Sequence, residues 1–174
     1  TRTELLSAEN ADVDSLVTIG RRQRVIGASY ATEKRTVKYF DTELRDLATA
    51  LGNALPGQPT ISFVGASEDE RELLLITGSD VDPGMLYKFD RDTNQLNPLL
   101  PIRETTEGRT LAEMTPVTFP AADGTQIPGY LTLPPGSDGK NLPAIVMPHG
   151  GPSSRDEWGF DWLVQFFAAR GYAV

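Results

Sequence analysis

Cysteine is absent from the 174-residue chain, and histidine occurs only once, at His149. The lack of cysteine excludes disulfide scaffolds, thiolate zinc sites and cysteine nucleophiles. Because no second histidine or cysteine exists to share an ion, we expect no metal at His149. No sequence feature indicates a cofactor either. A triad or proton relay within the chain could use only this one imidazole.

Positive charge is also scarce, with 16 Lys and Arg residues against 24 Asp and Glu, a net charge of −8. This balance argues against nucleic acid as a partner, because nucleic acid binds positive surfaces that replace its counterions. It equally argues against adhesion to anionic membranes. No apolar run approaches the roughly 18–20 residues of a membrane-spanning helix. The N-terminus lacks both Met and the apolar core of a signal peptide, so we expect an internal start.

Glycine (16 residues) and proline (13 residues) are frequent, which favours turns and short strands over a helical bundle. Charge is unevenly distributed along the chain. Residues 1–115 contain 13 basic and 19 acidic residues, whereas residues 116–174 contain 3 and 5, together with both tryptophans. This change predicts two domains, 1–115 and 116–174, with a boundary near Thr115–Pro116.

The first part is predicted to consist mainly of short strands separated by turn residues. One helix is expected where leucines recur at intervals of three and four residues, from Leu44 to Leu55. Asp41 or Thr42 can cap its start, and Pro56 stops it. The expected strands are Leu16–Ile19, Arg24–Ala28, Arg35–Phe40, Ile61–Val64, Leu73–Thr77 and Met85–Phe89.

These strands contain a weak internal sequence repeat. Residues 25–29 and 63–67 have similar sequences 38 residues apart, and residues 39–41 and 88–90 echo each other 49 residues apart. Periods of about 40–50 residues with short strands are typical of propeller blades. Coincidence between similar strand and turn sequences explains the echo equally well, so both interpretations stay open.

Residues 116–174 predict a hairpin followed by a strand, a loop, a helix and a strand. The hairpin is expected over 116–120 and 126–133, and a wholly apolar strand buried on both faces over 144–147. The capping-box spacing from Ser154 to Glu157 indicates the start of a largely buried helix, which ends before a strand at 172–174. This order is the βαβ unit of a parallel sheet.

Other polar and aromatic groups have simple structural interpretations. The acidic run Glu68–Glu70 is interpreted as a solvated turn rather than a calcium site, because no calcium-loop pattern follows. Arg24 belongs to a small basic cluster that we expect at a solvated strand edge. Trp158 and Trp162 are expected to pack in the core rather than to line a pocket.

The motif with chemical meaning is His149-Gly150-Gly151-Pro152, between the expected buried strand and helix. Two successive glycines allow a sharp turn and leave room for a substrate. Their amides can stabilise the oxyanion of a tetrahedral intermediate in acyl transfer, as in the His-Gly-rich loop of α/β-hydrolases. The candidate catalytic residues are therefore Gly151, Gly150 and His149, with an ordinary loop histidine as the alternative for His149.

Three segments occur in an informative order: residues 123–134 (DGTQIPGYLTLP), 142–152 (LPAIVMPHGGP) and 166–174 (FFAARGYAV). Together they resemble the start of the catalytic domain in the prolyl oligopeptidase family of serine peptidases (family S9), especially its acylaminoacyl-peptidase and dipeptidyl-peptidase-like members. The resemblance is specific over residues 116–174. It is looser over 1–115, where residues 80–84 and 86–90 look like late blades of the family's β-propeller.

The resemblance implies a mixed fold, with antiparallel β-propeller blades over 1–115 and the first part of a mostly parallel α/β-hydrolase domain over 116–174. It implies a peptidase whose propeller restricts entry to short peptides. The family's Gly-Gly-Pro loop corresponds to residues 150–152, with the Gly151 amide as oxyanion donor. His149 falls where some members place a tyrosine that assists the oxyanion, and it does not correspond to the triad histidine.

The chain departs from the family in having no Gly-x-Ser-x-Gly sequence. The resemblance therefore implies that the nucleophile, acid and base lie beyond Val174, and that residues 1–174 are a fragment, inactive by itself. Exopeptidase or endopeptidase action and side-chain preference stay undecided.

Two other functions stay open. A carboxylesterase or lipase would share the His-Gly-Gly loop, although the blade-like strands upstream argue against it. A propeller-type binding module with a degenerate hydrolase part would need no triad at all. The peptidase interpretation implies a short peptide as substrate, and it does not decide whether the protein forms a homo-oligomer. It favours the bacterial periplasm, with the cytoplasm as the other compartment.

Overall fold

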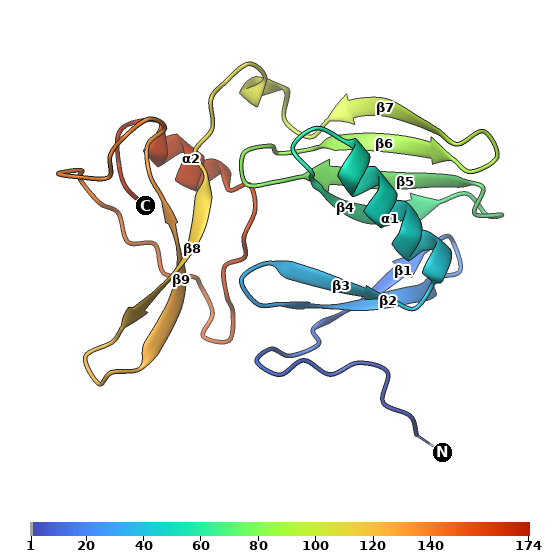
Figure 1. Ribbon diagram of the computed structural model, residues 1–174, viewed down its shortest axis with the longest axis horizontal. Helices are drawn as coiled ribbons and strands as arrows, with labels where there is room; N and C mark the ends of the chain where they lie inside the picture. The colour runs from blue at the N-terminus through green and yellow to red at the C-terminus, as the bar shows by residue number, and fades with distance from the viewer. Residues whose placement is uncertain (1) are drawn as a thin grey trace. The chain divides into compact units, whose positions relative to one another are not determined.

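The computed structural model describes residues 2–174 and divides into two compact units, each described here by itself (Figure 1). The first unit comprises the residues up to Ser79 together with Gly84–Glu104. The second comprises Asp80–Pro83 and Thr105–Val174. The short segment Asp80–Pro83, which connects two strands of the first unit, therefore makes its contacts in the second.

The first unit begins with a three-stranded antiparallel sheet, in which β1 (Ser15–Ile19), β2 (Arg24–Ala31) and β3 (Arg35–Tyr39) follow one another in space as in sequence. β2 is the most buried of the three, because it pairs with a neighbour on both sides. The expected strands in this region are confirmed.

Helix α1 (Thr42–Ala54) follows β3 directly. Its N-cap is Asp41, whose carboxylate accepts a hydrogen bond from the backbone N–H of Leu44 at 3.1 Å. The helix ends just before Pro56, because proline has no N–H to continue the helical hydrogen bonds. The leucine stripe therefore predicted this helix and its cap correctly, and Leu44 is the member of the stripe that is fully buried.

A four-stranded antiparallel sheet completes the first unit, in the order β4 (Thr60–Ala66), β5 (Glu72–Gly78), β6 (Met85–Asp90) and β7 (Gln95–Pro101). β7 was missed by the sequence analysis because it contains Pro98 and Pro101. Proline is tolerated there because β7 is an edge strand, where one row of N–H groups has no ladder partner to reach.

Gly84 shows why the β5–β6 connection needs glycine. Its φ of +107° lies in the region that favours glycine, and a Cβ at this position would meet the Thr77 carbonyl oxygen at 2.0 Å. No side chain fits at that distance. The backbone can therefore close this turn only with glycine.

The core of the first unit lies between its two sheets and α1. Phe63 on β4 packs edge-on against Tyr39 of β3, with ring centroids 6.0 Å apart. The buried core residues are Ile19, Ile26, Leu44, Phe63, Leu73, Leu75 and Phe89. Because this core draws on both sheets and on the helix, neither sheet is expected to be stable without the other.

The second unit contains an antiparallel hairpin of β8 (Met114–Pro120) and β9 (Gln126–Thr132), preceded by a short 3-10 turn at Glu104–Thr106. The hairpin confirms the sequence prediction. Past β9, Thr132 and Val174 exchange two backbone hydrogen bonds of 2.9 Å, and Ala144 forms an isolated parallel bridge with Ala173. These contacts bring the last two residues between β9 and the segment near Ala144.

Helix α2 (Trp162–Ala168) begins later than predicted. Its N-cap is Asp161, whose carboxylate accepts from the N–H groups of Leu163 and Val164. The predicted capping box at Ser154 is therefore wrong. Residues 152–157 are exposed and without helical structure, because a box sequence starts a helix only where an apolar face can then be buried.

The fold prediction is confirmed for its antiparallel part, since sheets of three and four strands are consistent with propeller-like blades. The α/β-hydrolase part is not evident. Residues 144–147 form one bridge instead of a buried strand, and Val146 is 90% exposed. The predicted burial of α2 is also wrong for Trp162, which is 56% exposed. A parallel strand needs neighbours on both sides, and the described residues supply only this bridge.

Candidate functional site

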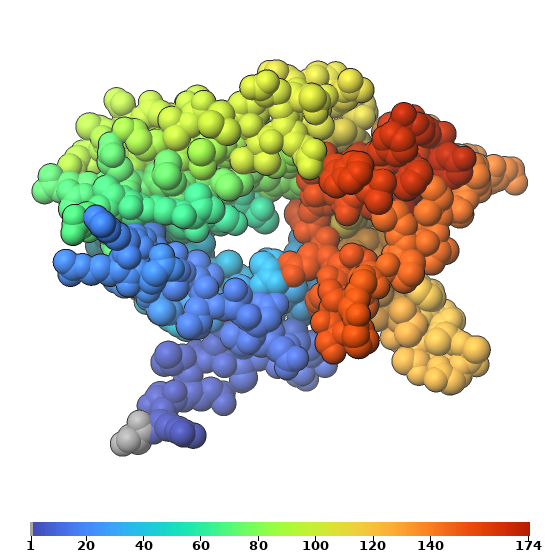
Figure 2. Space-filling model, turned by 180° about the vertical axis from the view of Figure 1, so that it is seen from behind, coloured from blue at the N-terminus to red at the C-terminus, as the bar shows by residue number. Residues whose placement is uncertain are grey.

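The candidate loop runs from the parallel bridge at Ala144 to the N-cap of α2 at Asp161. Two backbone hydrogen bonds fix its start: the N–H of Ile145 donates to the Ala173 carbonyl at 2.8 Å, and the N–H of Ala173 donates to the Pro143 carbonyl at 2.9 Å. Residues 148–157 are exposed, and the orange-red segment of Figure 2 shows this part of the chain at the surface. A substrate can therefore reach the backbone of the loop.

The two glycines of the motif differ in their surroundings. A Cβ on Gly150 would meet nothing within 4 Å, so the space beside this residue is open. Gly151 has a φ of +148°, and a Cβ there would lie 3.0 Å from the Ser153 backbone nitrogen. Gly151 is therefore required by the turn itself, whereas Gly150 leaves room for an approaching group.

His149 is exposed and turns back onto its own loop. Its Nδ1 lies 2.7 Å from the carbonyl oxygen of Gly150. A carbonyl oxygen only accepts hydrogen bonds, so Nδ1 carries the hydrogen. The bond links the side chain of the first motif residue to the peptide group that joins the two glycines.

A buried polar cluster near this loop was missed by the sequence analysis. The side-chain amide of Gln165 on α2 accepts from the N–H of Ala112 at 2.8 Å and donates to the Ala112 carbonyl at 2.8 Å. It also donates to the carbonyl of Asp80 at 3.1 Å. The Asp80 carboxylate in turn accepts from the N–H of Met114 at 2.7 Å. One glutamine thus joins three segments of the second unit.

Trp158 connects the end of the candidate loop to the same cluster. Its indole N–H donates to the carbonyl of Met114 at 2.8 Å, and the side chain is half-buried. Trp158 therefore anchors the loop as well as packing, which partly agrees with its predicted core role. No sequence signal indicated these contacts, because the partners lie 44 to 85 residues apart.

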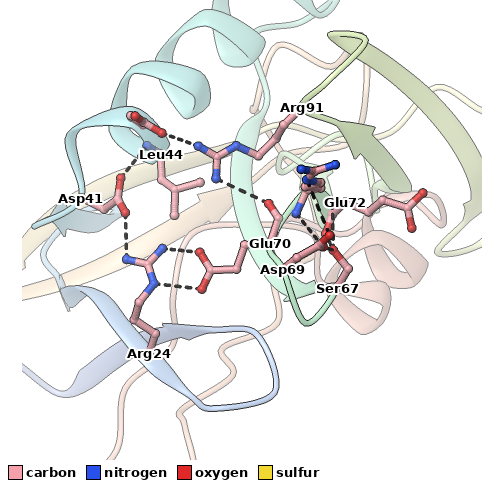
Figure 3. A network of polar contacts seen from close by, with 10 residues as sticks. Arg24, Asp41, Leu44, Ser67, Asp69, Glu70, Glu72 and Arg91 are labelled. Atoms are coloured by element: carbon pink, nitrogen blue, oxygen red, sulfur yellow. Dashed lines mark hydrogen bonds and ion pairs between the residues drawn. The ribbon is translucent and has the colours of Figure 1, made fainter.

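A second polar network lies entirely in the first unit (Figure 3). Arg24 forms ion pairs with Glu70 at 2.5 Å and with Asp41 at 2.9 Å. Arg91 pairs with Glu43 and also donates to the Glu70 carbonyl. The network ties β2, the start of α1 and the turns after β4 and β6 together.

These ion pairs change the acidity of the carboxyl groups. The hydrogen bond from Arg24 holds the pKa of Glu70 below its ordinary value of 4.5. Burial raises the pKa of Asp41, but the bonds from the Leu44 N–H and Arg24 outweigh it and lower the pKa below 3.8. Arg24 and Glu70 were expected to be solvated, but they form specific ion pairs. We interpret this network as structural.

Residues 2–174 contain no group of three or more His, Asp or Glu side chains placed to hold a metal ion. In the same residues, no helix is long and apolar enough to cross a membrane.

The known proteins that are similar to this chain and are described here are all peptidases. No family model matches the chain. Dipeptidyl aminopeptidase BIII of Pseudoxanthomonas mexicana is 28% identical over 180 residues, which cover 99% of this chain and 26% of that protein. The chain therefore spans about a quarter of the length of this curated relative.

Solved structures share the fold. A puromycin-hydrolyzing peptidase of Mycobacterium tuberculosis matches 85% of this chain and 23% of its own, with a TM-score of 0.57 and 19% identity. A prolyl endopeptidase matches 97% of this chain and 24% of its own, with a TM-score of 0.60 and 16% identity. These relatives confirm the resemblance drawn from the motifs. The chain is thus similar to peptidases of the prolyl oligopeptidase family, family S9, over almost its whole length.

Proposed function

We propose that the chain is part of a longer serine peptidase that hydrolyses peptide bonds of short peptides, and that its loop at residues 148–152 supplies an oxyanion donor. The observation that carries this proposal is the exposed Gly150–Gly151 peptide, with open space beside Gly150 and a bond from His149 on its carbonyl. An exposed N–H in a glycine turn can approach a reacting carbonyl oxygen without steric hindrance.

In the proposed reaction, a serine oxygen attacks the carbonyl carbon of the peptide, and its proton passes to a histidine. The carbonyl oxygen becomes an oxyanion, to which the Gly151 N–H donates a hydrogen bond. The amine leaves with the proton from the histidine, and water then hydrolyses the acyl-enzyme to release the acid. The 174 residues contain no Gly-x-Ser-x-Gly sequence, so the proposal assigns the nucleophile, acid and base to a longer protein.

The two parts of the chain have different roles in this proposal, with the boundary taken from the sequence prediction. Residues 1–115 would contribute propeller blades that admit short peptides, and residues 116–174 would contribute the start of the catalytic domain. The antiparallel sheets of the first unit support the blade assignment. The similarity of the chain to a dipeptidyl aminopeptidase over 99% of its length supports the reaction class.

The test is fluorophosphonate labelling of the native gene product, followed by peptide mapping with mass spectrometry. We expect a protein longer than 174 residues, with the label on a serine outside them. Heat-denatured protein is the control for non-specific labelling, and the isolated 174-residue chain should take no label. A native protein without label would overturn the proposal and favour a binding module.

Substrate assays on the labelled protein then separate peptidase from esterase. We expect hydrolysis of short peptides, with little turnover of folded proteins. Hydrolysis of carboxylic esters without any peptide cleavage would contradict the peptidase assignment and favour the carboxylesterase or lipase reading.

A further inference from the structure

Strand β8 has one edge that no other strand covers. Among the residues that the structure describes, β9 is the one strand paired with β8, so a row of β8 backbone groups points away from the hairpin (Figure 1). Such a row can pair with a strand of another molecule and start edge-to-edge association. The composition of β8 adds to this hazard, because its seven residues (MTPVTFP) carry no charge and Phe119 is 52% exposed.

The hydrogen bonds around the hairpin show which residues form this outward row. In an antiparallel pair, alternate residues direct their N–H and C=O groups toward the partner strand. Just past β8, the N–H of Ala121 donates to the Thr125 carbonyl at 2.8 Å, so the odd-numbered residues of β8 bond toward β9. The even-numbered residues direct their groups to the free edge, and these are Met114, Pro116, Thr118 and Pro120.

Three of these four residues have no N–H to offer an incoming strand. Pro116 and Pro120 lack the N–H altogether. The N–H of Met114 donates to the Asp80 carboxylate at 2.7 Å, and the Met114 carbonyl accepts from the indole N–H of Trp158 at 2.8 Å. Only Thr118 keeps a donor in the row, and one donor is too few for a ladder of hydrogen bonds.

We propose that β8 is a blocked edge, at which Pro116, Pro120 and the bond from Met114 to Asp80 prevent a second copy of the protein from adding a strand. The prolines occupy positions where no bond to β9 is lost, so they block the outer edge without weakening the hairpin. Many edge strands are protected by charged side chains. β8 has none, and the missing and occupied N–H groups take their place.

The test restores the two missing donors in the full-length protein with the double variant Pro116→Thr/Pro120→Thr. Threonine suits an edge strand and adds neither charge nor a large apolar side chain. We expect the variant to form larger species at concentrations about 10-fold or more below those that the wild type needs, measured by analytical ultracentrifugation. The matched control is Pro135→Thr, in an exposed turn outside the strands, which should behave as the wild type does.

Hydrogen exchange followed by mass spectrometry then locates the contact. We expect the amides of residues 116, 118 and 120 to become protected when the double variant associates, because they would bond to the added strand. Association without this protection would overturn the proposal, since the contact would then involve side chains such as exposed Phe119. Unchanged association of the double variant would overturn it as well. If the double variant does not fold, the single variants Pro116→Thr and Pro120→Thr provide the same test with smaller expected effects.

Discussion

Gln165 and Asp80 lie 85 residues apart in the sequence, and the Gln165 side-chain amide donates to the Asp80 carbonyl oxygen at 3.1 Å. The same amide satisfies both backbone groups of Ala112, and Gln165 is buried. Buried backbone groups without partners are costly, so this one side chain holds α2 against two other segments. The second unit therefore depends on a polar residue within the apolar pattern of its helix.

Replacing Gln165 should destabilise the protein. Gln165→Leu keeps a side chain of similar size but leaves the Ala112 N–H and two carbonyls without hydrogen bonds. We expect the free energy of unfolding to fall by roughly 2–4 kcal/mol, measured by chemical denaturation. The matched control is Gln95→Leu on exposed β7, which should change it by less than about 0.5 kcal/mol. Equal losses in the two variants would show that the buried bonds contribute nothing specific.

The Arg24 network should make stability depend on pH. The pKa values of Asp41 and Glu70 lie below their ordinary 3.8 and 4.5, so the folded state favours the charged carboxylates. Their contribution is fully present above these ordinary values. It is lost as the pH falls through the lowered pKa values of the folded state.

The measurement compares wild type with Arg24→Met at two pH values. Arg24 is 43% exposed, so solvent screening limits the loss at pH 7 to about 1 kcal/mol. We expect this difference to shrink in acid, as the pH falls through the lowered pKa values of Asp41 and Glu70 and the carboxylates become protonated in both proteins. Arg22→Met, at an exposed position in the turn just before β2, is the control and should show little effect at either pH. A difference that persists unchanged in acid would rule out the ion pairs as its source.

Replacing Gly151 by alanine should lower kcat, whereas the same change at Gly136, a positive-φ glycine outside the candidate loop, should not. Gly151→Ala places a Cβ 3.0 Å from the Ser153 nitrogen and forces the peptide to rotate. In the full-length protein we expect kcat to fall by roughly 10²–10³-fold, the usual cost of losing one oxyanion donor.

The control for backbone strain is Gly136→Ala. Gly136 has a φ of +76° and open space around its Cβ position, so it carries the same kind of strain outside the loop. We expect a small loss of stability and a kcat close to that of the wild type. Similar losses of kcat in both variants would mean that strain, and not the oxyanion donor, explains the effect of Gly151→Ala.

Local patterns in the first unit predicted its structure well. The helix from Thr42 to Ala54 and its cap at Asp41 follow from leucine spacing and a carboxylate within reach of the next N–H groups. Most strands followed from β-branched and aromatic runs between turns. The strand Gln95–Pro101 was not predicted, because its two prolines suggest a loop. The prolines are tolerated because this strand lies at the edge of a sheet.

The second unit was harder to predict for a physical reason. The apolar run at residues 144–147 has the composition of a buried strand, yet Val146 is almost fully exposed. Burial depends on which segments lie on either side, and composition does not contain that information. The capping box at Ser154 failed in the same way, since a local start signal cannot supply the packed face that a short helix requires.

The sequence by itself determined the family resemblance, the position of the candidate loop and the need for glycine within it, because these depend on residue identity and order over short distances. The tertiary structure alone decided that His149 bonds to the Gly150 carbonyl and that Gln165 joins Asp80 and Ala112. Such contacts depend on side-chain direction and on segments that come together only after folding. The spacing of residues in the sequence predicts neither the direction of a side chain nor which distant segments meet.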